Sequence, residues 1–236
     1  DAAVFATADR QVRGGAWAGV SIWCDGATVP ATFGDPRAVI ADLDGAPLTV
    51  APGGFAQASD RGAVQLAMRL RELIQLAPGG RIVELFAGSG TLSVVLAPLA
   101  DHYLAIEQSG PAAEQLRANL KARGIQAKVQ VGDANQFVVP RPTATVVLDP
   151  PRAGAREAVQ RLVTARPRQV VYVSCNLATL ARDLAVLTEA GYQVEQLELF
   201  ELFPQTSHVE TVVRLVRDSD RRSGGAQDGP QRPTPD

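Results

Sequence analysis

The stretch RIVELFAGSG, residues 81–90, decides the fold of this chain. Its first half is a short apolar run, typical of a buried strand, and a helical pattern, SGTLSVVLAPLA, follows at residues 89–100. Gly88 and Gly90 lie at the join. A Gly-x-Gly turn at this place lets a ligand approach the backbone and points the N–H groups of the next helix at it. The stretch therefore predicts a strand–turn–helix unit with a ligand at the turn.

Strand and helix patterns alternate along the rest of this region. A helix pattern at residues 59–80 comes first, with Ser59 or Asp60 as its cap. Such alternation predicts a parallel sheet that helices cover on both faces. The last two strands are joined too closely for a crossover helix, so we expect them to pair antiparallel. The predicted strands are 81–88, 102–108, 127–134, 144–151, 168–175, 192–204 and 207–217, with helices at 89–100, 111–124, 154–166 and 176–191 between them.

The two flanks have a different character. Residues 1–52 contain short apolar runs punctuated by turn residues, which predicts a small β-rich segment, part of a linking domain. Residues 53–217 form the α/β domain, and the polar, Gly- and Pro-rich residues 218–236 are predicted to be a disordered tail. The fold class is therefore α/β and Rossmann-like, a mostly parallel sheet with an antiparallel last strand. The first residue is Asp1, so we expect a fragment or a processed chain.

Composition limits the possible functions. The net charge of −2 over 236 residues argues against the whole chain binding polyanions, although five arginines fall within residues 152–168 beside a single acid, Glu157. Those arginines are either a nucleic-acid patch or a solvated helix face. Cys24 and Cys175 are too few for a disulfide framework or a cysteine metal site, so we expect no metal and a reducing cytoplasm. With no apolar run of ~18 residues, we expect a chain that does not span a membrane. We also expect a monomer.

Acidic residues follow three of the predicted strands. Glu107 ends one strand 17 residues after Gly90, Asp133 follows the next, and Asp149 starts the step DPP. Ligands of open α/β sheets bind at these carboxyl ends, and an acid at Glu107 can hold both hydroxyls of a ribose. Each acid alone could be a helix cap or a loop charge, but the series predicts a nucleoside cofactor. An NAD site fits poorly, because Ser93 stands where the third fingerprint glycine would be.

Five motifs resemble those of the RNA uracil-5 methyltransferase family, which makes 5-methyluridine in ribosomal or transfer RNA. The similarity covers about residues 50–217, and the resemblance implies a class I methyltransferase fold, S-adenosylmethionine as cofactor and an rRNA or tRNA substrate. The motifs appear in the family's order: GGFAQAS (53–59), ELFAGSG (84–90), LDPPRAG (148–154), VYVSCNLATLARDL (171–184) and LFPQTSHVET (202–211).

The chemistry of this family explains two residues. Carbon 5 of uracil is a poor nucleophile until a thiolate adds to carbon 6, and a base must later remove the proton on carbon 5. Cys175, at a strand end beside a helix N-terminus that favours an anion, is the predicted nucleophile, although a free cysteine is often only a packed side chain. Glu210 is the predicted base, because the start of an antiparallel last strand would meet Cys175. His208 is expected to orient or support this site.

The resemblance also implies binding residues. Phe55 is expected to stack on an extruded base, with a core position as the alternative, and Arg152 and Asp149 are expected to bind the substrate. Leu177 replaces the family's usual proline, and the iron–sulfur cysteines and RNA-binding barrel of many relatives are not found in this sequence. The cofactor-binding residues that the resemblance implies are Gln57, Phe86, Gly88, Gly90, Thr91, Glu107, Asp133 and Asp149.

Three other functions fit parts of the pattern. An enzyme acting on an exocyclic amine of adenine or guanine usually has an aromatic after the two prolines, where this chain has Arg152, and needs no thiolate. A cytosine-5 enzyme uses the same cysteine addition and is the closer alternative. A non-catalytic cofactor- or RNA-binding relative is the third, and the presence of both Cys175 and Glu210 argues against it.

Overall fold

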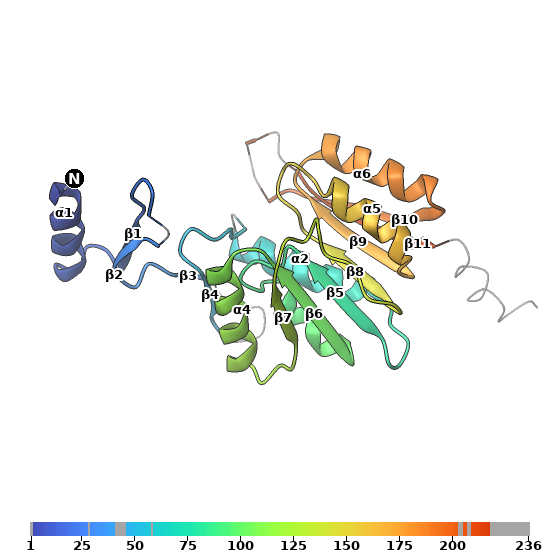
Figure 1. Cartoon of the computed structure of the whole chain (residues 1–236), viewed down its shortest axis with the longest axis horizontal. Coiled ribbons are helices and arrows are strands. Elements are labelled where there is room, and N and C mark those ends of the chain that lie inside the picture. Colours follow the sequence, from blue (N-terminus) through green and yellow to red (C-terminus); the bar gives the residue numbers. More distant parts are fainter. Residues whose placement is uncertain are drawn as a thin grey trace, which may run out of the picture.

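A seven-stranded sheet forms the main body of the computed structural model, which describes residues 2–27, 29–40, 46–57, 59–202, 205–206 and 209–217. Its strand order is β10-β11-β9-β8-β5-β6-β7 (Figure 1). The strands from β5 to β9 pair parallel, whereas β11 pairs antiparallel with both of its neighbours. The predicted fold class is confirmed. The strands are β5 (Arg81–Leu85), β6 (His102–Glu107), β7 (Lys128–Val131), β8 (Thr145–Leu148), β9 (Gln169–Ser174), β10 (Tyr192–Phe200) and β11 (Glu210–Arg217).

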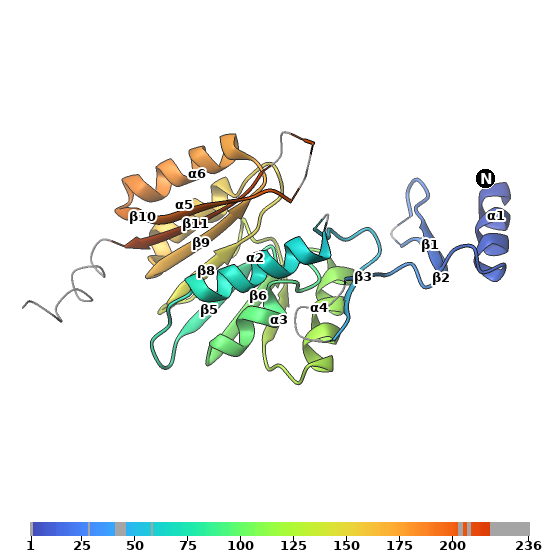
Figure 2. The same ribbon diagram turned by 180° about the vertical axis from the view of Figure 1, so that it is seen from behind.

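Helices cover both faces of this sheet, as Figures 1 and 2 show from opposite sides. One face packs against α2 (Asp60–Leu73), α3 (Ser93–Leu96) and α4 (Gly110–Ala122), and the other against α5 (Arg156–Ala165) and α6 (Leu177–Glu189). Alternation along β5 shows how the strands serve two cores. Ile82 belongs to the first core and Val83 to the second, and both are fully buried. None of the helices in the described residues has the length and apolar character that crossing a membrane requires.

Two predictions from the sequence need correction, one at the N-terminus and one after β5. The predicted β-rich segment begins instead with α1 (Ala2–Arg13), in which alanine, the best helix former, supplies four of the first seven residues. An Asp9–Arg13 ion pair one helical turn apart supports α1, and Gly15 follows it at φ 73°. The second helix, predicted at 89–100, is only α3 followed by a 3₁₀ turn at Ala97–Leu99.

The rest of the N-terminal segment is β as predicted. It forms two antiparallel hairpins, β1 (Gly19–Ile22) with β2 (Ala31–Gly34), and β3 (Ala38–Ile40) with β4 (Leu48–Val50). The elements α1, β1 and β2 lie at one end of the molecule, away from the large sheet (Figure 1). The predicted disordered tail at 218–236 lies outside the described residues.

A buried asparagine joins β4 to the large domain. Asn119 of α4 donates to the carbonyl oxygens of Thr49, at 2.7 Å, and Ser89, at 2.8 Å, and it accepts from the Thr49 N–H at 3.1 Å. Ser89 lies inside the glycine turn and accepts in its turn from the Ala51 N–H at 3.1 Å. The chain that leads toward Phe55 is therefore fastened to the turn that is predicted to bind a ligand.

Replacing Asn119 with alanine should destabilise the fold by about 2–4 kcal/mol, because it leaves several buried backbone groups without partners. Urea unfolding followed by circular dichroism measures this loss. Lys121→Ala, an exposed change on the same helix, is the control and should change the free energy of unfolding little. Equal losses for the two variants would contradict the role given to Asn119.

Candidate active site

The pairing of β11 with β9 brings the predicted nucleophile and base together. Thr211 of β11 pairs with Ser174 of β9 in antiparallel register. One residue back from Thr211 and one residue on from Ser174, the same register sets Glu210 opposite Cys175. Cys175 is half-buried, whereas Glu210 is only 2% exposed. Asn176, the next residue, caps α6 by accepting from the N–H groups of Ala178 and Thr179. The thiol therefore lies at a strand end, at the start of a helix, and beside a buried carboxyl group.

Three carboxyl groups occupy the same face of the sheet near this edge. Burial raises the pKa of Glu210 to about 7. Burial, followed by the nearby charges of Glu210 and Glu84, raises the pKa of Asp149 well above its usual range. Glu84 on β5 accepts from Ser93 and, at 2.7 Å, from Tyr103, yet burial still raises its pKa to about 7. Burial therefore raises the pKa of all three carboxyl groups at this end of the sheet.

The electrostatics of Cys175 differ from the prediction. Burial of the thiol and then the charge of Glu210 raise its pKa, and Asp149 adds to the shift. The Arg152 guanidinium works the other way, because it hydrogen-bonds the sulfur and carries a positive charge. The helix N-terminus was expected to favour the anion, and burial and the charges of Glu210 and Asp149 act in the opposite direction. The fold therefore raises the pKa of the Cys175 thiol and places one arginine where it stabilises the thiolate.

The loop after β8 is held in place by α6. The carbonyl oxygen of Arg152 accepts from Asn176 Nδ2 and from the Thr179 hydroxyl, both at 3.2 Å. Leu177, where the family usually has proline, is the first residue of α6 and is 57% exposed. Proline is also well suited to this first helical position, so the start of α6 accommodates either residue.

Asp183 is a positioning residue that sequence reasoning missed. It is buried in α6 and accepts from the Ala155 N–H at 2.8 Å and from the Tyr172 hydroxyl at 2.7 Å, while Arg182 pairs with its other oxygen. The loop leaves no room at Gly154, where a Cβ would lie 2.6 Å from Arg182 and 2.8 Å from Asp183. An acid at helical spacing between Leu180 and Leu187, on the apolar face, was the signal that could have found it.

The glycine turn and Glu107 form a second group. Glu107 accepts from the Gly88 N–H through one oxygen and from the Ser109 N–H through the other, both at 2.7 Å. Gly88 has φ 56° with open space where a Cβ would stand, and Gly90 packs so closely that a Cβ would lie 2.3 Å from Leu116. Phe86, with φ 64°, precedes the turn and is half-buried. The two glycines therefore have different roles. Gly88 leaves the backbone open to a ligand, and Gly90 allows the turn to pack closely against Leu116.

The surroundings of the turn suit a nucleoside cofactor. Gln57 Oε1 and Asn135 Oδ1 are buried and have no hydrogen-bond partner in the described part of the chain. Asn135 also donates its N–H to Asp133 Oδ1 at 2.8 Å, so this unpartnered oxygen belongs to the Asp133 loop. Thr91, half-buried, follows the turn directly. Such orphaned polar atoms are what a bound polar molecule would satisfy.

The outcomes for the remaining predicted site residues differ. Phe55 is 69% exposed, so its alternative as a core residue is excluded. His208 lies outside the described residues. The structure gathers Cys175, Glu210, Asp149 and Arg152 into one constellation. It gathers Gly88 and Glu107 into another, and these two groups meet at the carboxyl edge of one sheet.

Comparison with known proteins gives matches along most of the chain. The family model described as methyltransferase small domain matches residues 46–172, and the model described as tRNA (uracil-5-)-methyltransferase matches residues 141–218. A 23S rRNA (uracil(1939)-C(5))-methyltransferase RlmD from Shewanella sp. (strain ANA-3) is 39% identical over 177 residues, and the RlmD of Cronobacter sakazakii is 37% identical over 186 residues. The resemblance found in the motifs is confirmed.

These relatives are longer than this chain. The Shewanella alignment covers 73% of this chain and 39% of the relative, and the Cronobacter alignment covers 75% and 42%. A solved structure, the tRNA (uracil-54, C5)-methyltransferase of Pyrococcus abyssi in complex with S-adenosyl-L-homocysteine, matches with a TM-score of 0.72 and 28% identity. That match covers 85% of this chain and 51% of the solved chain.

The raised pKa of Glu210 predicts a pH-dependent stability. The folded protein keeps a proton on this group between about pH 4.5 and 7 that the unfolded chain has lost, so the free energy of unfolding should fall as pH rises through this window. Glu210→Gln removes the free-energy cost of ionising this buried carboxyl group. The variant should therefore be more stable than the wild type at pH 8 by up to about 3 kcal/mol, with no gain at pH 4. Urea unfolding at the two pH values measures the difference.

Glu114→Gln, a change of an exposed carboxylate on α4, is the matched control and should show no such pH-dependent gain. A Glu210→Gln variant that gains as much stability at pH 4 as at pH 8 would contradict the assignment of the raised pKa.

Proposed function

Because this chain belongs to the methyltransferase small domain family and matches the tRNA (uracil-5-)-methyltransferase model toward its C-terminus, we propose that it methylates carbon 5 of a uridine in rRNA or tRNA. The observation that carries this proposal is the antiparallel register that sets Glu210 opposite Cys175. A thiol and a buried carboxyl group at facing strand ends are the two groups that addition to carbon 6 and removal of the carbon 5 proton require.

The residues of the chain take the following steps in this proposal. The Cys175 thiol releases its proton to solvent, with Arg152 stabilising the thiolate, and the sulfur forms a bond to carbon 6 of the uracil. Carbon 5 thereby becomes nucleophilic and accepts the methyl group. The Glu210 carboxylate then removes the proton on carbon 5, the carbon 6–sulfur bond breaks, and 5-methyluridine leaves with the thiolate regenerated. A Glu210 pKa of about 7 suits a group that must exist in both protonation states at neutral pH.

S-adenosylmethionine, when bound, supplies the electrophilic methyl group. We assign its binding to the open turn at Gly88, to Glu107, and to the Asp133 loop, with Gln57 facing it by its unpartnered oxygen. Phe86, Gly90 and Thr91 shape the same turn. The solved Pyrococcus abyssi enzyme is in complex with S-adenosyl-L-homocysteine, the product that this cofactor becomes after methyl transfer, which supports the assignment.

The target base is held by the other group of residues in this proposal. Phe55 offers an exposed aromatic ring in the segment that Asn119 and Ser89 fasten beside the glycine turn. Stacking on such a ring is how enzymes hold an extruded base. Asp149 and Arg152 lie beside Cys175 and are the candidates for the polar edge of the uracil. Cytosine shares the ring chemistry, but the uracil-5 family model and the RlmD relatives are named for uracil, and so uracil is preferred.

The Cys175→Ala variant should lose all methylation yet bind S-adenosylmethionine as the wild type does, because the sulfur reacts only with the base. Transfer of tritiated methyl groups to unmodified rRNA and tRNA measures activity, and calorimetric titration measures cofactor affinity. Cys24→Ala, a change of the exposed cysteine, is the control and should keep full activity. Methylation by Cys175→Ala would remove the proposed nucleophile.

The Glu210→Gln variant should accumulate a covalent protein–RNA adduct, because release of the enzyme requires removal of the carbon 5 proton. Denaturing gel electrophoresis with labelled RNA shows the adduct as a slowly migrating band. The double variant Cys175→Ala, Glu210→Gln should show none. Absence of the band from Glu210→Gln while Cys175 still reacts with an alkylating agent would contradict the role of Glu210.

A further inference from the structure

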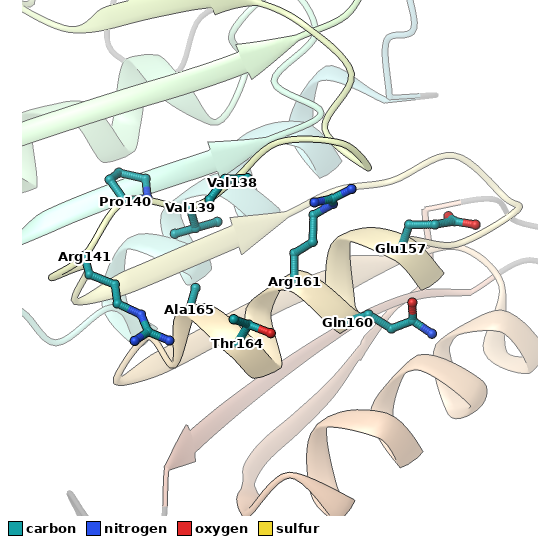
Figure 3. A pocket seen from close by; sticks show the side chains of 9 residues that line it. All are labelled: Val138, Val139, Pro140, Arg141, Glu157, Gln160, Arg161, Thr164 and Ala165. Atoms are coloured by element: carbon teal, nitrogen blue, oxygen red, sulfur yellow. The ribbon is translucent and has the colours of Figure 1, made fainter.

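A cavity of about 710 Å³ lies away from the catalytic constellation, between α5 and the loop that joins β7 to β8 (Figure 3). Its apolar side is made by Val138, Val139 and Pro140 of the loop and by Ala165 of α5. Val138 is 72% exposed, so it presents an apolar surface at the rim of the cavity. The proposed reaction does not use this cavity.

The walls of the cavity are fixed to one another by Arg161. Its Nε donates to the Asn135 carbonyl oxygen and a terminal nitrogen donates to Gln136 Oε1, both at 2.7 Å. Figure 3 shows Arg161 projecting from α5 toward the loop, while Arg141 reaches from the loop toward Thr164 and Ala165. The cavity is therefore a preformed groove with a guanidinium group on each wall.

The arginines around this groove lack acidic partners. Arg141 lines the groove, and Arg156 directly precedes the lining residue Glu157 on α5. In the described ranges, the side chains of Arg141 and Arg156 form no ion pair or hydrogen bond, and both residues are exposed. Elsewhere Arg69 pairs with Glu198 and Arg214 with Glu195. Of the nine residues that line the groove, only Glu157 is acidic. Unpaired guanidinium groups beside an exposed apolar wall suit a polyanion that also has apolar faces, which describes RNA.

Helix α5, which forms one wall of the groove, begins shortly after the loop that carries Arg152. Arg152 contacts Cys175, Arg156 begins α5 four residues later, and Arg141 lies near the far end of that helix. A helix of 10 residues is about 15 Å long, so these arginines mark a path from the catalytic edge down one side of the domain.

We propose that this groove binds the sugar–phosphate backbone of the RNA next to the target uridine. The proposal rests on the proposed function for the identity of the partner. Phosphate contacts of this kind position a nucleic acid without reading its sequence. The groove therefore sets how tightly and in which direction the RNA lies, while the Cys175 constellation performs the chemistry on the single extruded base.

Charge reversal tests the groove separately from the chemistry. Arg141→Glu and Arg156→Glu should each weaken the binding of a stem-loop RNA several-fold in fluorescence anisotropy. Each should also lower the slope of log affinity against log salt by about one. The KM for this RNA should rise, while kcat at saturating RNA and S-adenosylmethionine affinity stay unchanged. Arg71→Glu makes the same charge change on α2, across the sheet, and should leave the affinity and the salt slope unchanged.

Two binding results would overturn the proposal. One is wild-type RNA affinity for both groove variants, or an equal loss for Arg71→Glu. The other is an acidic peptide that binds the groove more tightly than the RNA does and displaces it, which would identify a protein partner. Failure of the proposed function looks different, because the wild-type chain would then show the groove-dependent RNA binding without transferring a methyl group to any uridine.

Discussion

The antiparallel insertion of β11 between β9 and β10 is the constraint on which the site depends. A parallel strand would begin at the opposite edge of the sheet, far from Cys175. The antiparallel direction makes β11 begin where β9 ends, and the Thr211–Ser174 pair leaves Glu210 opposite the thiol. Because a slip of one residue in register would turn Glu210 to the other face, the buried side chains of β11 also determine the catalytic geometry.

This arrangement has an electrostatic consequence. Glu210, Asp149 and Glu84 share one face and one end of the sheet, and burial raises the pKa of each. Their negative charge would oppose a thiolate, and the pKa of Cys175 is raised accordingly. Arg152 has the opposite effect and lowers the pKa of Cys175. Asn176 and Thr179, at the start of α6, hold the backbone of Arg152 in place. The site therefore disfavours the thiolate through its carboxyl groups and favours it through one positioned cation.

The sequence predicted the strands of the large sheet well, because their short apolar runs alternate with helical patterns, although the helix expected at 89–100 is much shorter. The antiparallel last pair followed from a short connection, and the positions of Cys175 and Glu210 followed from that pairing. Prediction failed where local propensity and pattern disagreed. The alanines of α1 outweigh the Val- and Thr-rich character of its flank. Asp183 and Asn119 were missed because a polar side chain on a buried helix face is recognised by its partners, and these lie 70 residues away for Asn119 and 28 for Asp183.

The pKa values could not be predicted from sequence at all, since they depend on burial and on groups brought together by the fold. The dipole of α6 acts on Cys175 through a single helix end, which is a modest effect of about 1 kcal/mol or less at such sites. Partial burial of the thiol raises its pKa most, and two carboxyl groups add to the shift. A cysteine before a helix is thus insufficient to predict an activated thiolate. What makes Cys175 a nucleophile in the proposed reaction is the combination of Arg152 at the sulfur and a carboxyl group across the strand that can accept the proton left on carbon 5.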